Sequence, residues 1–265
     1  MSQKNRLDIE LLNRQLVSSR SQAENLIKLG LVLVNKKSVT KPGYFVSHDS
    51  EISVTKSPFV SRAALKLASV ASIFKLSFTG KVVLDVGSST GGFTEFALKN
   101  GAKKVFAVDV GTNQLHPSLR SDSKIELHEQ TNILDIRPWK LDLRNNIKKD
   151  TMVQGPKSNV YISRVPDIVL IDVSFVSLRT ILPHISKYLA TKNTQVVAML
   201  KPQFESGSSL KNKGVIKNDS IRRKIIKDFE AWVKQYYIIE QKADSAVAGQ
   251  KGNQEKFYLL HKLDK

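Results

Sequence analysis

The chain has 265 residues, 41% of them hydrophobic, so it is long enough to bury the cores of one large domain and one small one. It contains no cysteine, which excludes disulfides, thiolate metal sites, iron–sulfur clusters and a thiol nucleophile. Its formal net charge of +18 attracts polyanions and makes nucleic acid the leading class of partner.

The longest apolar stretches fall far short of the roughly 20 residues that a membrane helix needs. The first ten residues, MSQKNRLDIE, lack the apolar centre of a signal peptide. We therefore expect a cytoplasmic protein that does not bind membranes, holds no metal and acts as a monomer.

Residues 1–54 are predicted to form a small α+β domain. Leu7 and Leu11 recur at helical spacing, and Ser19 and Gln22 have the spacing of a capping box that begins a second helix. The segment LVLVNKKSVT predicts strand, turn and strand, and EISVTK predicts a closing strand.

This stretch resembles the S4-type RNA-binding module, named for a small-subunit ribosomal protein. The matching segments are R-L-D at 6–8, S-R-S-Q-A at 19–23 and G-L-V-L-V-N at 30–35. Such modules bind structured RNA through the second helix and the turn that follows. The resemblance implies phosphate contacts from Arg6, Arg20, Lys28, Lys36 and Lys37, to which we add Arg62.

Residues 55–60 are predicted to be a linker, and residues 61–265 a second domain whose first helix has Ser61 as its N-cap. Within it, residues 81–111 predict a strand, a glycine-rich turn, a helix and a second strand. Glycines at such a turn let the backbone approach a ligand, and the free N–H groups of the following helix point at that ligand. This is the pattern of a nucleotide-type cofactor site.

The spacing of the turn favours S-adenosylmethionine over a dinucleotide. Ser89 occupies the place of the second glycine in the dinucleotide fingerprint, where a pyrophosphate touches the main chain. Asp85 would repel a pyrophosphate but can accept a hydrogen bond from an amino group. Asp109 suits the ribose hydroxyls of either cofactor. The full set expected to hold the methyl donor is Asp85, Gly87, Ser88, Ser89, Gly91, Gly92, Phe93, Asp109, Val110 and Asn132.

The rest of the chain alternates predicted strands and helices. Strands are expected within 166–175 and 194–204 and near the C-terminus, helices within 178–189 and 219–236, and a long surface loop over 137–165. This alternation predicts a parallel, doubly wound sheet of the Rossmann-like kind.

Two charged residues end predicted apolar strands. Asp172 follows Ile171, and Lys201 follows Leu200. Ligands of such sheets bind outside the carboxyl ends of the strands, so both side chains should open toward the cofactor crevice. For Lys66 and Glu255, position in the sequence alone is weaker evidence that the side chain lies at this crevice.

Five motifs across the second domain resemble the TlyA family of ribosomal RNA methyltransferases, whose catalytic domain is similar to FtsJ-type ribose 2′-O-methyltransferases. They are S-R-A-A-L-K-L at 61–67, D-V-G-S-S-T-G-G-F-T at 85–94, D-V-S-F-V-S-L at 172–178, L-K-P-Q-F-E at 200–205 and G-N-Q-E at 252–255. The resemblance implies methylation of a cytidine ribose in ribosomal RNA or a ribosomal subunit, with a catalytic tetrad of Lys66, Asp172, Lys201 and Glu255. The chain departs from the family in its longer loop and in Lys256, a cation beside Glu255.

A ribose hydroxyl must lose its proton as it attacks the methyl donor, so a base is needed. We expect Lys201 to fill this role, because a second cation, Lys66, and a water-poor site both favour its neutral form. An aspartate close to Lys201 would favour the charged form instead. The identity of the base within the tetrad therefore stays open.

Two other functions compete with ribose methylation. Methylation of an RNA base is the nearer one, but D-V-S-F at 172–175 lacks the prolines typical of amino-group methyltransferases. Carbon-5 methylation of a pyrimidine needs a cysteine. A membrane-active haemolysin, a label often given to TlyA-like proteins, is disfavoured by the absence of apolar segments and amphipathic helices with aromatic anchors.

Overall fold

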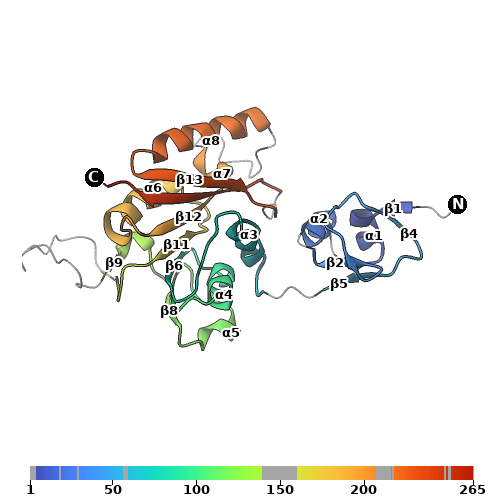
Figure 1. Cartoon of the computed structure of the whole chain (residues 1–265), viewed down its shortest axis with the longest axis horizontal. Helices are drawn as coiled ribbons and strands as arrows, with labels where there is room; N and C mark the ends of the chain where they lie inside the picture. Colours follow the sequence, from blue (N-terminus) through green and yellow to red (C-terminus); the bar gives the residue numbers. More distant parts are fainter. Residues whose placement is uncertain are drawn as a thin grey trace, which may run out of the picture.

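The computed structural model describes residues 4–17, 19–28, 30–55, 59–138, 160–206, 216, 218–247, 249 and 252–264. Residues 4–54 form one folded unit, on the right in Figure 1. Its elements are β1 (Lys4–Arg6), α1 (Leu7–Asn13), α2 (Arg20–Lys28), β2 (Val32–Val34), β3 (Lys37–Ser38), β4 (Phe45–Ser47) and β5 (Ile52–Val54).

The N-terminal unit has its own apolar core, made by one face of each helix and by the strands. Its buried members are Leu7, Leu11, Val17, Ala23, Ile27, Val32, Val34 and Val46. The Ser19 hydroxyl accepts a hydrogen bond from the Gln22 amide, as the capping-box spacing predicts. The predicted turn between β2 and β3 also forms, with Asn35 and Lys36 at φ +50° and +65°. The pairing of β1 with β4 was not predicted.

The larger unit, on the left in Figure 1, is built on a seven-stranded sheet of order β13-β14-β12-β11-β6-β7-β8. Its strands are β6 (Val82–Val86), β7 (Lys104–Val108), β8 (Ile125–His128), β11 (Ile168–Ile171), β12 (Gln195–Leu200), β13 (Tyr237–Asp244) and β14 (Lys256–Lys262). Its helices are α3 (Arg62–Ala71), α4 (Gly92–Lys99), α5 (Pro117–Arg120), α6 (Leu178–His184), a π-helix (Ile185–Leu189), α7 (Pro202–Glu205) and α8 (Asp219–Val233).

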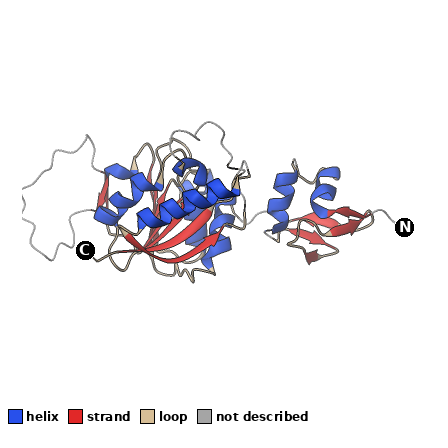
Figure 2. Ribbon diagram, turned by 90° about the horizontal axis from the view of Figure 1, so that it is seen from above, coloured by secondary structure: helices blue, strands red, loops and turns tan. Residues whose placement is uncertain are grey.

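Helices cover both faces of this sheet (Figure 2). Alternate residues of each strand point to opposite faces, so Leu84 of β6 packs with Leu182 of α6 and Phe229 of α8. Val83 packs on the other face with Leu67 of α3 and Phe93 of α4. The predicted α/β fold is therefore confirmed, with β6, near the middle of the sheet, buried along its whole length.

Three details differ from the predictions. First, the sheet is not fully parallel, since β14 runs antiparallel to β12 and pairs with the unpredicted edge strand β13. Second, the ends of the predicted 137–165 loop form two short paired strands, β9 (Ile136–Pro138) and β10 (Val160–Ile162), whereas residues 139–159 lie outside the described residues. Third, the strand expected up to Phe204 ends at Leu200, because Pro202 begins α7.

Candidate functional site

The turn between β6 and α4 has an unusual backbone. Gly87 and Gly91 lie in the left-handed region at φ +79° and +92°, and Ser89 joins them at φ +47°. A Cβ at Gly87 would lie 2.7 Å from the carbonyl oxygen of Asp172, so only glycine fits between β6 and β11 here. The turn brings the N-terminus of α4 to the carboxyl edge of the sheet.

Asp85 is fully buried, on the sheet face that packs against α3 and α4. Thr94 of α4 donates a 2.6 Å hydrogen bond to its Oδ2, whereas Oδ1 has no hydrogen-bond partner in the described part of the chain. Burial, and to a lesser degree the nearby charge of Asp172, raise the pKa of Asp85 to about 7. A buried carboxylate with one unused oxygen is suited to a cationic ligand.

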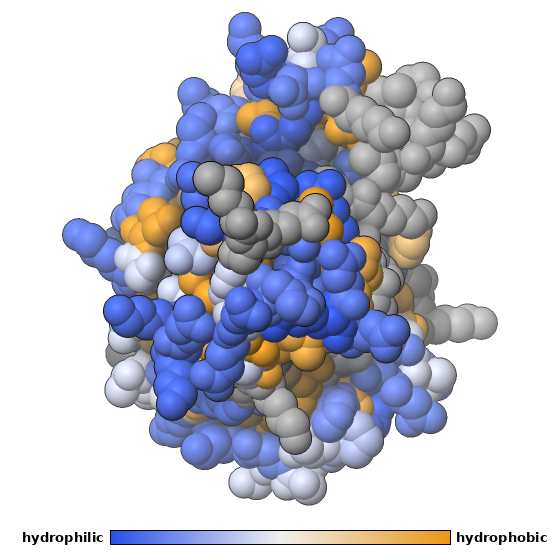
Figure 3. Space-filling view, turned by 90° about the vertical axis from the view of Figure 1, so that its right-hand side faces the viewer, coloured by the Kyte–Doolittle hydropathy of each residue, from blue (hydrophilic) through white to orange (hydrophobic). Residues whose placement is uncertain are grey.

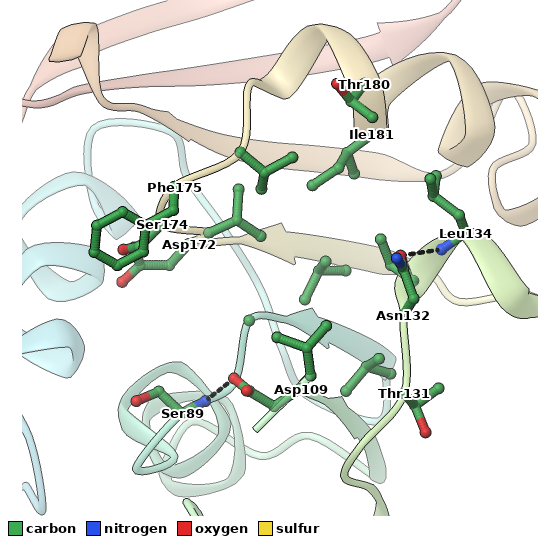
Figure 4. Close-up of a pocket in the computed structure, with 17 residues that line it drawn as sticks. Ser89, Asp109, Thr131, Asn132, Leu134, Asp172, Ser174, Phe175, Thr180 and Ile181 are labelled. Atoms are coloured by element: carbon green, nitrogen blue, oxygen red, sulfur yellow. Dashed lines mark hydrogen bonds between the residues drawn. The ribbon is translucent and has the colours of Figure 1, made fainter. Parts of the chain in front are cut away.

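Asp109 follows β7 and lies level with the glycine turn. Its Oδ2 accepts the Ser89 amide at 2.8 Å, and its Oδ1 accepts the Gly111 amide at 2.7 Å. Both bonds fix the carboxylate at the edge of a cavity (Figure 4), where its remaining lone pairs can accept ligand hydroxyls.

That cavity has a volume of about 430 Å³ and lies at the carboxyl ends of β6, β7 and β11. Apolar side chains form much of its wall, and Figure 4 shows Asp109 and Asn132 at its rim. A smaller cavity of about 140 Å³ adjoins it and is lined by Asp85, Ser88 and Lys201. Gly87, Ser89, Asp172 and Ser174 border both cavities.

The paired cavities fit S-adenosylmethionine, which has an adenosine half and a charged amino-acid half. The larger cavity offers apolar walls for the base and Asp109 for the ribose. In the smaller one, Asp85 Oδ1 and Ser88 Oγ are buried polar atoms without a described hydrogen-bond partner, and they suit the amino and carboxylate groups.

The predicted cofactor residues divide into two groups. Eight of the ten line one of the two cavities: Asp85, Gly87, Ser88, Ser89, Phe93, Asp109, Val110 and Asn132. Gly91 and Gly92 line neither. A Cβ at Gly91 would lie 2.5 Å from the Leu119 side chain, and one at Gly92 would lie 2.4 Å from Ser61 Oγ. These two glycines allow close packing around the helix N-terminus.

The four predicted tetrad residues form two ion pairs. Lys201 Nζ lies 2.6 Å from Asp172 Oδ1, and Lys66 Nζ lies 2.6 Å from Glu255 Oε2. All four side chains are at least 86% buried. Bringing them out of water is costly unless they are paired, so the pairs are well suited to a dry site.

Strand register explains how residues so far apart in sequence converge. Ile171 lies opposite Val86 of β6 and Ala198 of β12, and Leu200 lies opposite Lys256 of β14. Asp172, Lys201 and Glu255 therefore leave neighbouring strands at one edge of the sheet. Lys256 pairs instead with Asp244 at 3.2 Å, so the extra cation is not a partner of Glu255.

Two site residues were missed by the sequence predictions, although both stand in the D-V-S-F motif. Ser174 Oγ accepts a 2.8 Å hydrogen bond from Lys201 Nζ, which places it beside the Asp172 pair. Phe175 lines the larger cavity, has φ +66° and is 92% exposed, with its ring centroid 5.2 Å from that of Phe204. A left-handed backbone at a phenylalanine is strained, which is typical of functional sites.

The residues predicted to contact RNA differ in their exposure and in their ion pairs. Lys36, Lys37 and Arg62 are exposed. Arg6 and Arg20 are about half exposed and both pair with Asp8. Lys28 ends α2, and its side chain lies outside the described residues.

No cluster of metal-ligating side chains was found among the residues that the structure describes. Within the same residues, no helix combines the length and the apolar character needed to cross a bilayer.

Comparison with known proteins gives two family matches. The FtsJ-like methyltransferase family matches residues 59–262, and the S4 domain family matches residues 5–52. Hemolysin A of Brachyspira hyodysenteriae is 35% identical over 260 residues, 97% of this chain and 98% of that protein. The 16S/23S rRNA (cytidine-2'-O)-methyltransferase TlyA of Mycobacterium tuberculosis is 35% identical over 222 residues, 83% of this chain and 75% of that protein.

A solved structure from Streptococcus thermophilus, which carries the hemolysin name, is similar over the full chain. It is 34% identical, covers 100% of this chain and 90% of its own, and superposes with a TM-score of 0.67.

Proposed function

The chain belongs to the TlyA family of FtsJ-like methyltransferases, and we propose that it transfers a methyl group from S-adenosylmethionine to the ribose 2′-hydroxyl of a cytidine in ribosomal RNA. The observation that carries the proposal is the Lys201–Asp172 ion pair on the border between the two cavities. A methyl donor and a ribose hydroxyl can meet at that border with charged groups beside them.

S-adenosylmethionine supplies a methyl group on a positively charged sulfur. In our proposal Asp109 binds the ribose of the cofactor, and Asp85 and Ser88 bind its amino-acid end. Asp85 does so in its ionised form, since the ligand group next to it is a cation. Phe93 and the glycine turn close the space around them.

The tetrad holds the acceptor hydroxyl and takes its proton. Lys201 has three N–H donors and uses them on Asp172 and Ser174. For Lys201 to accept the proton, binding of the acceptor must first loosen its contact with Asp172. Lys66 and Glu255 form the second pair and orient the acceptor.

Phe175 lies where an acceptor nucleotide would enter. Its ring is exposed at the mouth of the larger cavity, and base stacking on such rings stabilises single-stranded RNA by about 1–3 kcal/mol per base. We propose that the ring contacts the nucleotide whose ribose is methylated.

The S4 domain and the charge support an RNA substrate. The net charge is +18, and hydrophilic side chains cover most of the described part of the face shown in Figure 3. The M. tuberculosis relative is named for 16S and 23S rRNA, and the Campylobacter jejuni relative for 23S rRNA. That the protein acts in the cytoplasm, and that it acts as a monomer, are still predictions from the sequence.

The proposal is tested with purified protein, radiolabelled S-adenosylmethionine and three RNA substrates: 30S subunits, 50S subunits and transfer RNA. We expect label in RNA of at least one subunit and none in transfer RNA. Label in protein alone, or in no substrate while the cofactor binds, would contradict an RNA methyltransferase.

A further inference from the structure

A buried carboxylate lies at the junction of the two helices of the S4 domain. The Asp8 side chain has no exposed surface, yet two arginines that are half exposed contact it. Arg6 donates from Nε to Oδ1 and from Nη2 to Oδ2, each at 3.0 Å, and Arg20 donates from Nε to Oδ2 at 2.8 Å. One carboxylate thus fixes two guanidinium groups.

The backbone holds this carboxylate in place. Arg6 and Asp8 lie at the start of α1, and Arg20 is the first residue of α2, so Asp8 connects the two helices. The Asp8 amide donates to the Pro42 carbonyl at 3.2 Å. A Cβ on the neighbouring Gly43 would lie 3.4 Å from Nη1 of Arg6, so the guanidinium packs directly on this glycine.

The two arginines keep the buried carboxylate of Asp8 in its charged form. Burial by itself raises the pKa of Asp8, and hydrogen bonds from Arg6 and Arg20 more than compensate, so that the pKa ends below its usual value. An arginine has five N–H donors in a rigid plane. The contacts with Asp8 use two donors of Arg6 and one of Arg20, so each guanidinium keeps donors for a second acceptor.

We propose that Asp8 is a positioning residue for RNA binding, whose carboxylate holds Arg6 and Arg20 in the geometry that binds backbone phosphate. The inference rests on the proposed function, since it assumes an RNA substrate. Arginine forks bind phosphate bidentately, and fixing them in advance reduces the conformational entropy lost on binding. A negative side chain would then strengthen the binding of a negative ligand.

Because Asp8 and RNA are both negatively charged, the effect of removing the charge of Asp8 distinguishes positioning from simple repulsion. Asp8→Asn and Glu24→Gln each remove one negative charge beside Arg20, whose Nε lies 3.5 Å from Glu24 Oε1. If charge alone mattered, both variants would bind RNA more tightly. Positioning predicts that Asp8→Asn binds deproteinised ribosomal RNA at least tenfold more weakly, whereas Glu24→Gln binds as tightly as wild type or slightly more tightly.

The salt dependence of binding separates positioning from a general loss of structure. Losing two phosphate contacts lowers the slope of log Kd against log salt concentration by about 1–2. Circular dichroism and thermal melting establish which variants are folded. If Asp8→Asn does not fold, Arg20→Lys replaces it, since lysine keeps the charge and lacks the planar fork. Positioning predicts that Arg20→Lys loses most of the affinity that Arg20→Ala loses.

The outcomes are distinct. A folded Asp8→Asn variant with unchanged or tighter RNA binding overturns the inference, and so does Arg20→Lys at wild-type affinity. In either case, wild-type protein that binds the RNA leaves the proposed function standing. Wild-type protein that does not bind ribosomal RNA overturns both.

Discussion

The ammonium group of Lys201 lies 2.6 Å from the carboxylate of Asp172, at the border of the two cavities that we assign to the methyl donor. The two residues end adjacent parallel strands, β12 and β11. In our proposal this contact joins the site of the donor to the site of the acceptor.

Replacing Lys201 with alanine should remove methyl transfer while leaving cofactor binding nearly intact. The lysine contacts Asp172 and Ser174 and, in our proposal, serves the acceptor hydroxyl, so its loss should slow transfer by about 10²–10⁴-fold. Single-turnover rates and cofactor titration by calorimetry measure the two effects. Lys192→Ala, at an exposed lysine, is the matched control and should keep wild-type rates. A large loss of cofactor affinity in Lys201→Ala would instead place this lysine in the cofactor site.

Asp85→Asn should stabilise the cofactor-free protein at high pH. The folded-state pKa of about 7 lies above the ordinary value of 3.8, so the folded protein holds a proton that the unfolded chain has released between these values. Stability therefore falls as the pH rises from about 4 to 7, and the full cost, on the order of 4 kcal/mol, applies above pH 7. Asparagine removes that cost and can still accept from Thr94. Thermal unfolding of both proteins at pH 5 and pH 8.5 tests this.

We expect the melting temperature of Asp85→Asn to exceed that of wild type more at pH 8.5 than at pH 5. The same variant should bind S-adenosylmethionine at least tenfold more weakly at pH 8.5, because the charge opposite the amino group is lost. An equal change in melting temperature at both pH values would show that Asp85 is not the titrating group. Unchanged cofactor affinity would remove Asp85 from the binding site.

Gly249→Ala should displace Glu255 and slow the reaction. The added methyl would lie 2.8 Å from Oε1 of Glu255, whose other oxygen pairs with Lys66. We expect at least a tenfold lower transfer rate with cofactor affinity within twofold of wild type. Gly252→Ala is the control, since its methyl meets nothing within 4 Å but sits at φ +89°, so it strains the same loop without touching Glu255. Equal rates in the two variants would argue against a role for the Gly249 contact.

The sequence predicted best what lies close together along the chain. Asp85, Gly87 and Asp109 belong to one strand–turn–helix–strand unit, and the fold of that unit follows from local apolar runs and glycines. The strands β8 and β13 lie at the two edges of the sheet and are partly exposed. They were missed because they carry too few apolar residues to be recognised as strands from an apolar pattern. The pair β9 and β10 was missed because each strand has only three residues, too few to show an alternating pattern.

Pairing between distant residues could not be predicted from patterns alone. Lys66 and Glu255 entered the tetrad through resemblance to a family, and they meet because α3 packs on the sheet face that carries Phe257 of β14. Likewise, Asp8 stands in the R-L-D segment of the resemblance, but its contact with Arg20 was not predicted, because that contact depends on how α1 packs against α2.

Removing residues 1–55 should weaken RNA binding and leave the remainder folded. Among the described residues, the apolar core of the N-terminal unit is made only of residues from that unit, and the two clusters on the large sheet use none of them. We expect an unchanged cofactor affinity and at least a tenfold weaker affinity for ribosomal RNA. RNA affinity equal to that of the full chain would make the S4 domain dispensable for binding.

The chemical position of the added methyl group tests the central claim most directly. Ribosomal RNA methylated by the purified protein is digested to nucleosides and analysed by mass spectrometry, with the Lys201→Ala variant as the blank. Our account predicts 2′-O-methylcytidine, in which the extra 14 mass units remain with the ribose on fragmentation. Methyl groups found on the base fragment, or 2′-O-methylcytidine formed equally by Lys201→Ala, would contradict it.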